Sequence, residues 1–285
     1  MRLDDERMSD NVEDRRGNRG GFAVGGRHIG IGAIVLALVI AYFTGINPMT
    51  PLGMEQQLAP TQSVPAHAPP ANDPSARFVA KVLASTEDVW TQIFKEHGKT
   101  YQDPKLVLYS GSTPTACGHG QAAMGPFYCP MDQKVYIDLG FYRELRDRFH
   151  APGEFAQAYV IAHEIGHHVQ YLLGTSEKVD RARHAVGQAE SNAMSVRLEL
   201  QADCYAGVWG KRADNMRHIL EPGEAEEAIK AASAIGDDAL QKASQGYVVP
   251  DSFTHGTSAQ RIRWFEKGFE TGDPGQCNTF KVSKL

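Results

Sequence analysis

The alternation of apolar and polar positions divides the chain into four segments. Residues 1–28 are polar and lack apolar periodicity, which is typical of a disordered arm. Residues 29–46 form an apolar run without a charge, and residues 47–74 are rich in proline, alanine and glutamine, which favours an extended linker. Residues 75–285 combine helical and alternating apolar periods with turn residues, so we expect one globular domain there.

The apolar run of residues 29–46 is predicted to be a single transmembrane anchor, at the short end of what spans a bilayer. The alternatives are a buried core helix and a cleaved signal peptide, but no small-x-small cleavage pattern follows the run. Six arginines precede it, whereas residues 47–76 contain no lysine or arginine. By the positive-inside rule, we expect the N-terminal arm in the cytoplasm and the globular domain outside, in the periplasm or an equivalent space.

Within the globular domain, strand-like runs come early and helical periods predominate afterwards. Short strands are predicted at residues 105–111, 126–130 and 134–139. Helical periods cover, in order, residues 74–98, 153–174, 191–213, 221–243 and 258–272. The expected fold class is therefore α+β, mainly helical, with a small sheet built early in the domain and helices behind it.

Composition and cysteine spacing exclude two classes of function. The formal net charge is −5, without the basic surplus of nucleic-acid-binding proteins, so we expect no nucleic-acid partner. The four cysteines form no CxxC pair, which makes a zinc ribbon improbable. Their positions are Cys117, Cys129, Cys204 and Cys277.

An even number of cysteines in an exported domain favours disulfides, and four cysteines allow three pairings. The most local pairing joins Cys117 to Cys129 and closes a loop worth about 3 kcal/mol in the chain-entropy model. It leaves Cys204 to pair with Cys277. The alternative is a set of four reduced, buried thiols.

The stretch "AHEIGHH" places a metal-binding pattern on an apolar helix. His163 and His167 are four residues apart, so they lie one turn apart on one face and can reach a single ion. In this HExxH pattern Glu164 is the general base that acts on a metal-bound water, not a ligand. His168 points about 100° away around the helix, so we expect it to pack elsewhere. The alternative is core histidines that match the pattern by chance.

A catalytic zinc ion needs a third protein ligand, and the metzincin extension that would supply a third histidine is absent. The stretch "RLELQADCYAG" offers Glu199 and Asp203, which are four residues apart on one helix face. We predict that Glu199 is the third ligand and that Asp203 accepts a hydrogen bond from a ligand histidine. A solvated acidic face is the alternative, but apolar residues flank both carboxylates. One zinc ion per chain is expected.

Five stretches of the sequence together resemble the bacterial "putative neutral zinc metallopeptidase" family; they are "NVEDRRG", "GPFYCPMDQKVYID", "YVIAHEIGHHVQ", "LELQADCYAGVW" and "SFTHGTSAQRIRWF". The resemblance extends over nearly the whole chain and implies a membrane-anchored, zincin-like fold. It implies zinc ligands at His163, His167 and Glu199 and a general base at Glu164, with no departure at these four positions. It says little about the substrate.

Peptide hydrolysis also needs a hydrogen-bond donor to the oxyanion of the tetrahedral intermediate. The candidates are Tyr205, Tyr247 and His255, and of these His255 lies in a loop before the last helix that can reach back to the site. Arg261 is expected to hold this loop through an ion pair with a site carboxylate. For both residues, ordinary capping and surface solvation are the alternatives.

The function that we expect is that of a membrane-anchored zinc metalloendopeptidase with a protein or peptide substrate. An edge strand at residues 126–130 or 134–139 would bind this substrate by strand addition. Two alternatives remain. One is a zinc-stabilised binding or scaffold module without turnover, against which Glu164 argues, because a structural zinc site needs no base. The other is a zinc amidase that acts on cell-wall peptide.

Overall fold

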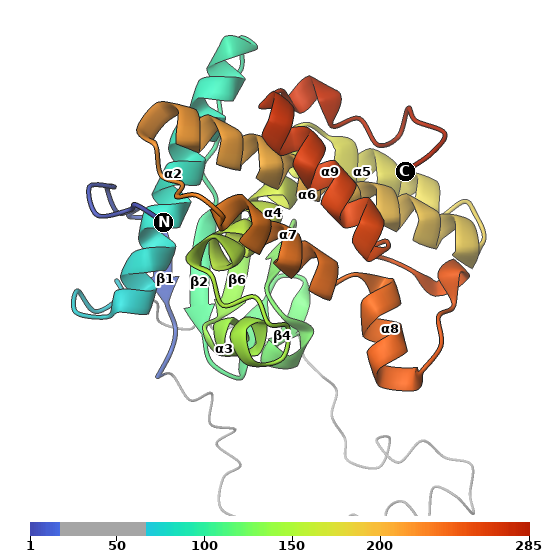
Figure 1. Ribbon diagram of the computed structural model, residues 1–285, viewed down its shortest axis with the longest axis horizontal. Helices are drawn as coiled ribbons and strands as arrows, with labels where there is room; N and C mark the ends of the chain where they lie inside the picture. Colours follow the sequence, from blue (N-terminus) through green and yellow to red (C-terminus); the bar gives the residue numbers. More distant parts are fainter. Residues whose placement is uncertain (18–66) are drawn as a thin grey trace, which may run out of the picture. The chain divides into compact units, whose positions relative to one another are not determined.

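A four-stranded sheet and a set of long helices make up the computed structural model, which describes residues 1–17 and 67–285 (Figure 1). The strand order in the sheet is β1 (Val12–Asp14), β2 (Lys105–Tyr109), β6 (Lys134–Asp138) and β5 (Phe127–Cys129). β1, β2 and β6 run parallel, whereas β5 pairs antiparallel with β6. A separate hairpin joins β3 (Ser112–Thr115) to β4 (Gly118–Gln121).

The helices account for most of the described residues, which confirms the mainly helical α+β class. They are α2 (Pro74–Glu96), α3 (Gly140–Asp147), α4 (Glu154–Leu172), α5 (Thr175–Arg183), α6 (Gln188–Arg217), α7 (Glu224–Ala234), α8 (Asp237–Gln245) and α9 (Ser258–Thr271). Short 3₁₀ turns lie between or after these elements, namely η2 (Ala122–Met124), η3 (Pro250–Ser252) and η4 (Pro274–Gln276). The helical period over residues 221–243 corresponds to two helices, α7 and α8, because Gly236 separates them.

Two glycines let the central helices approach closely enough to build a site between them. α4 packs between α6 and the strands β5 and β6, and α9 lies along α6 (Figure 1). A Cβ atom at Gly166 of α4 would lie 3.0 Å from the Cα atom of Ala202 in α6. A Cβ atom at Gly268 of α9 would lie 1.9 Å from the carbonyl oxygen of Cys204. Glycine costs about 1 kcal/mol relative to alanine inside a helix, and here close packing explains its presence.

The prediction of a disordered arm over residues 1–28 is wrong for residues 1–17, which belong to the folded domain. β1 pairs with β2 in parallel, and the side chains of Leu3 and Val12 are buried in the main core. The strand is only three residues long, which is too short for an alternating period to stand out in the sequence. Residues 18–28, the rest of the predicted arm, lie outside the described residues.

Arg7 and Glu13 of this N-terminal segment pair with residues that lie far away in the sequence. Glu87 of α2 is buried and pairs with Arg7, with 2.7 Å between Nη2 and Oε2. Glu13 of β1 accepts from Lys134 of β6 at 2.8 Å. Such long-range pairing turns a polar stretch into an ordered one, and the local sequence does not show it.

The predicted membrane anchor, residues 29–46, and nearly all of the predicted linker lie outside the described residues. Within residues 1–17 and 67–285, no helix is both long and apolar enough to cross a membrane. The sheet nevertheless constrains the predicted orientation. Asp14 and His67 exchange backbone hydrogen bonds of 2.8 and 3.1 Å, so the N-terminal segment and the domain lie on one side of any membrane. The predicted orientation, with the N-terminal arm in the cytoplasm and the domain outside, would separate β1 from β2. It therefore does not fit residues 1–17, which belong to the folded domain.

Candidate metal centre

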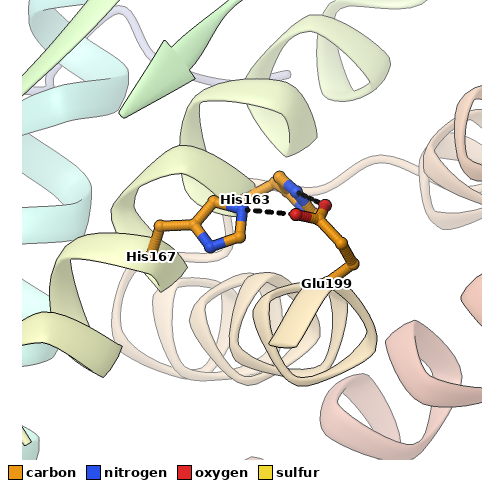
Figure 2. Close-up of side chains that lie close together, drawn as sticks. All are labelled: His163, His167 and Glu199. Atoms are coloured by element: carbon orange, nitrogen blue, oxygen red, sulfur yellow. Dashed lines mark hydrogen bonds and ion pairs between the residues drawn. The ribbon is translucent and has the colours of Figure 1, made fainter. Parts of the chain in front are cut away.

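The helices α4 and α6 bring together the three residues predicted as zinc ligands. His163 and His167 project from α4 towards Glu199 of α6, as Figure 2 shows. The Nε2 atom of His163 lies 3.2 Å from Oε2 of Glu199, and the Nε2 atom of His167 lies 3.5 Å from Oε1. One ligand atom from each residue lies within 4.8 Å of the others, which is the spacing of a shared metal ion.

The hydrogen bonds behind the two histidines show that the site fits a cation. The Nδ1 atoms of His163 and His167 already face the acceptors Asp203 and Gln170, at 2.8 and 2.9 Å. An imidazole that donates from Nδ1 carries a lone pair on Nε2. Both lone pairs then face the Glu199 carboxylate, and a metal cation bound between them would relieve this repulsion. Two imidazole nitrogens and one carboxylate oxygen are a ligand set of catalytic zinc.

Asp203 supports His163, as predicted, and is itself held by two other buried side chains. Its Oδ1 atom accepts from the Tyr159 hydroxyl at 2.5 Å, and both its oxygens accept from Arg261 at 2.9 Å. Burial alone would raise the pKa of Asp203, but the charges of Arg261 and His163 hold it well below its ordinary range. Arg261 therefore pairs with a site carboxylate, as expected from the sequence. Sequence reasoning missed Tyr159, although it lies four residues before His163 on the same helix face.

The charge of Asp203 also changes the basicity of His163. Burial would lower the pKa of this imidazole, but the charge and hydrogen bond of Asp203 outweigh it and raise the pKa to about 10. A more basic imidazole is a better metal ligand once a metal ion replaces its proton.

Glu164 lies beside the cluster without being part of it. Its side chain is buried, and burial raises its pKa above the ordinary value even though His163 and His167 lower it. A carboxylate with a raised pKa next to a metal centre is suited to take up and release a proton.

His168 faces away from the three ligands, as the helical geometry predicts. Its Nδ1 atom lies 2.9 Å from the Tyr128 hydroxyl of β5, and its Nε2 atom lies 2.7 Å from the carbonyl oxygen of Gln102. Burial lowers its pKa to about 4, so the ring is neutral. His168 thus ties the strand β5 to the metal-binding helix.

The three predicted oxyanion donors have different surroundings. Tyr205 is buried and packs edge-on against Trp90 in the core, whereas Tyr247 is 61% exposed after α8. His255 has a half-exposed side chain, and its Nδ1 atom lies 3.2 Å from Oδ1 of Asp237. The hydrogen bond that His255 donates to Asp237 raises the pKa of His255, and the charge of Glu199 adds to this effect. Of the three, His255 is therefore the one whose electrostatics are coupled to a metal ligand.

Both disulfides form in the pairing that locality favours in the sequence. Cys117 pairs with Cys129 at the end of β5, and Cys204 of α6 pairs with Cys277 after α9. The alternative of four reduced, buried thiols is therefore wrong. Cys204 directly follows Asp203, so the second disulfide joins the C-terminal segment to the helix of the metal centre.

Comparisons with known proteins identify relatives of the chain and its family. The chain is 54% identical over 289 residues to "Uncharacterized protein YpfJ" of Escherichia coli, covering 99% of this chain and all of that protein. It is 41% identical over 219 residues to "Uncharacterized protein Rv2575" of Mycobacterium tuberculosis, covering 73% of each chain. No solved structure matches it. Residues 1–280 match the family described as "Putative neutral zinc metallopeptidase", and the chain belongs to this family.

Proposed function

We propose that the protein is a zinc-dependent endopeptidase with a zincin-like fold, in which His163, His167 and Glu199 hold one zinc ion. The observation that carries the proposal is the convergence of two imidazoles and one carboxylate from two helices beside a buried fourth side chain, Glu164. The side chains of His167 and Glu199 are each 19% exposed, so the cluster remains open to solvent and substrate. A purely structural zinc site would be closed by a fourth protein ligand.

In this proposal, the residues of the chain divide the work of hydrolysis. Zinc, when bound, supplies Lewis acidity that polarises the peptide carbonyl and favours loss of a proton from water. Glu164 takes the proton from the attacking water and later delivers it to the leaving amine, for which its raised pKa is suited. Asp203 keeps His163 in the tautomer whose Nε2 atom faces the metal position.

His255 is proposed as the donor that stabilises the oxyanion, with Asp237 as its partner. The Asp237 carboxylate accepts from the His255 backbone nitrogen at 2.6 Å as well as lying close to the ring. This double contact orients the imidazole and favours its protonated form, which can donate to a developing negative charge.

The strand β5 is the proposed binding edge for an extended peptide. β6 lies between β2 and β5, so the alternative that residues 134–139 form the edge is wrong. β5 is the last strand of the sheet, and its Tyr128 is hydrogen-bonded to His168 of the metal-binding helix. A peptide added to β5 would therefore run beside α4, with main-chain hydrogen bonds to the strand.

Membrane anchoring through residues 29–46 and a location of the domain outside the cytoplasm are part of the proposal. Two disulfides support an oxidising compartment. The pairing of β1 with β2 requires residues 1–17 on the same side as the metal centre, so a single crossing is not proposed.

The test compares the full-length wild type with Glu164→Gln, using an unfolded protein such as reduced casein as the probe. We expect Glu164→Gln to bind one zinc ion per chain as the wild type does, and to lose about 10²–10⁴-fold of the peptidase activity. Chelation should remove the wild-type activity, and zinc should restore it. The exposed Glu177→Gln on α5 is the matched control and should keep full activity.

The same preparations distinguish the two alternatives. A scaffold module would bind zinc but cleave neither casein nor peptidoglycan fragments. A cell-wall amidase would cleave the fragments and not casein, in a manner that depends on Glu164. Either result would overturn the endopeptidase proposal.

A further inference from the structure

We propose that Gln170 is a positioning residue for His167, and that the C-terminal segment, residues 273–285, holds Gln170 in the required orientation. Gln170 is completely buried on α4, one turn after His167. Its Oε1 atom lies 2.9 Å from Nδ1 of His167. The inference rests on the proposed metal centre and adds to it a support that neither the motif nor the family comparison assigns.

The orientation of the Gln170 amide is determined by its other partners. Its Nε2 atom donates to the carbonyl oxygen of Leu198 at 2.7 Å and to Oε1 of Gln201 at 3.1 Å. A flipped amide would bring its oxygen against two acceptors. The amide oxygen therefore faces His167, and Nδ1 of that ring has to carry the hydrogen. The lone pair of His167 is thereby left on Nε2, which faces Glu199.

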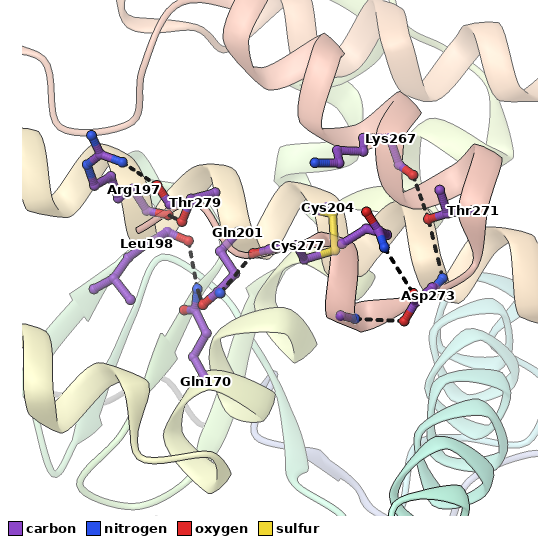
Figure 3. The surroundings of a disulfide bond; sticks show 12 residues. Gln170, Arg197, Leu198, Gln201, Cys204, Lys267, Thr271, Asp273, Cys277 and Thr279 are labelled. Atoms are coloured by element: carbon purple, nitrogen blue, oxygen red, sulfur yellow. Dashed lines mark hydrogen bonds between the residues drawn. A yellow bond between two sulfur atoms is a disulfide. The ribbon is translucent and has the colours of Figure 1, made fainter. Parts of the chain in front are cut away.

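Gln201 is oriented in turn by the C-terminal segment, as Figure 3 shows. Its Nε2 atom donates to the carbonyl oxygen of Cys277 at 2.9 Å, so its oxygen has to face Gln170. The disulfide between Cys277 and Cys204 holds that carbonyl against α6. A second attachment lies further along, where the Thr279 hydroxyl donates to the carbonyl oxygen of Arg197 at 2.6 Å.

These contacts form one directional chain of hydrogen bonds, in which each group donates to the next, from His167 through Gln170 and Gln201 to the carbonyl oxygen of Cys277. Each amide in the chain is buried, with 6% of Gln201 and none of Gln170 exposed. Water therefore cannot easily replace a missing member. Residues 273–285, which lie outside the metal-binding motif, thus contribute, together with the carbonyl oxygen of Leu198, to setting the tautomer of a metal ligand.

The proposal is tested by measuring the zinc dissociation constant of the full-length protein by competition with a chelator. Gln170→Leu should weaken zinc binding by about 10–100-fold, the usual effect of losing a partner of a ligand histidine. Gln201→Met should weaken it in the same direction by a smaller factor, because the Gln170 amide then loses its second acceptor. Gln92→Leu, at an exposed glutamine of α2, is the control and should bind zinc as the wild type does.

Two further readouts separate positioning from general destabilisation. In ¹⁵N-histidine spectra of the zinc-loaded protein, Gln170→Leu should shift the Nδ1–H signal of His167 and leave that of His163 unchanged. Gln170→Glu keeps an acceptor for Nδ1–H and should recover part of the zinc affinity that Gln170→Leu loses.

A disulfide comparison tests the role of the C-terminal segment. Replacing Cys204 and Cys277 by serine should weaken zinc binding, whereas replacing Cys117 and Cys129 by serine should not. Wild-type zinc affinity in folded Gln170→Leu and Gln201→Met would overturn the proposal. Because zinc affinity is measured without turnover, this result would be independent of whether the protein is a peptidase.

Discussion

The two histidine ligands on α4 are held by opposite kinds of support. His163 donates to the charged Asp203, which is in turn bound by Arg261 and Tyr159. His167 faces the neutral amide of Gln170, which is bound by other amides and carbonyls. Both supports leave Nε2 free to face the metal, but only the carboxylate adds negative charge behind its ring. The same tautomer can thus be set with or without a buried ion pair.

This difference has an energetic consequence. Asp203 and Arg261 form a buried ion pair, and losing one partner leaves the other charged and unpaired in the interior. Loss of the Gln170 amide leaves only neutral groups without partners, at a cost of about 1–3 kcal/mol. The support of His163 is therefore expected to be the more sensitive to mutation.

The largest expected effect comes from Asp203→Ala. Arg261 is 3% exposed and would lose its only carboxylate among the described residues, so the free energy of unfolding should fall by about 3–5 kcal/mol. Urea denaturation of the full-length protein measures this loss of unfolding free energy. The double variant Asp203→Leu/Arg261→Met should recover most of this stability without recovering zinc affinity. Equal losses in Asp203→Ala and Gln170→Leu would remove the contrast between the two supports.

Arg261→Met alone should have a smaller effect, and one restricted to His163. Asp203 would keep its bonds to Tyr159 and His163 but lose the cation that orients it. We expect zinc affinity to fall by about 10-fold, at the low end for a residue that acts through a ligand's partner. Chelator competition measures the loss, and the His167 signals in ¹⁵N spectra should not move. A shift at His167 would show that the two supports are not separate.

Val12→Ala tests whether a core change far from the metal centre affects either support. Val12 is buried in β1, and its truncation should lower the free energy of unfolding by about 2 kcal/mol. Zinc affinity should not change, since β1 pairs with β2 and not with the metal-binding helices. A parallel loss of zinc affinity would show that both supports depend on the stability of the whole domain.

The position of β1 also makes a prediction about cells. Asp10→Cys in the N-terminal segment and Lys99→Cys in the domain are exposed positions on one folded body. In intact cells, a membrane-impermeant maleimide should label both variants or neither. Labelling of only one would show that β1 is not paired with β2 in the same chain.

A third histidine, His255, extends the comparison to a half-exposed ring with a buried carboxylate partner, Asp237, and has the smallest expected effect. Asp237 raises the pKa of His255 above 6.5. The protonated ring is therefore favoured in the folded protein, and this stabilisation is fully present below pH 6.5 and lost as the pH rises through the higher, folded pKa. If protonated His255 stabilises the oxyanion, activity falls over the same range. Asp237→Asn should move that fall to lower pH by about one unit, measured as the pH profile of kcat/KM. An unchanged profile would exclude His255 from this role.

The carboxylate support could be predicted from the sequence, whereas the amide support could not. Glu199 and Asp203 stand out because two acidic residues four apart in an apolar helix need a reason to be buried. Gln170 and Gln201 carry no charge, and a buried glutamine has no spacing that distinguishes it from an exposed one. Their role depends on Cys277, which lies more than 70 residues beyond Gln201 and contacts it only through the fold.

The same reason explains what was right and wrong in the fold. The long helices have strong local periods, and α2 and α4 begin and end close to where proline and glycine indicate. β1 was missed because its partners, the backbone of β2 and the side chain of Lys134 in β6, lie far along the chain. α6 begins at Gln188, three residues before the predicted helical period, with Gly187 as the residue that precedes its first turn.

The most direct test of the account is the position of zinc in a crystal of the full-length, zinc-loaded protein, located by anomalous scattering. The account predicts one ion bound by Nε2 of His163 and of His167 at about 2.0–2.1 Å and by Glu199 at about 2.0–2.2 Å, with Nδ1 of each ring still facing Asp203 or Gln170. Zinc bound through Nδ1 of either ring, or closed in by a fourth protein ligand, would contradict it.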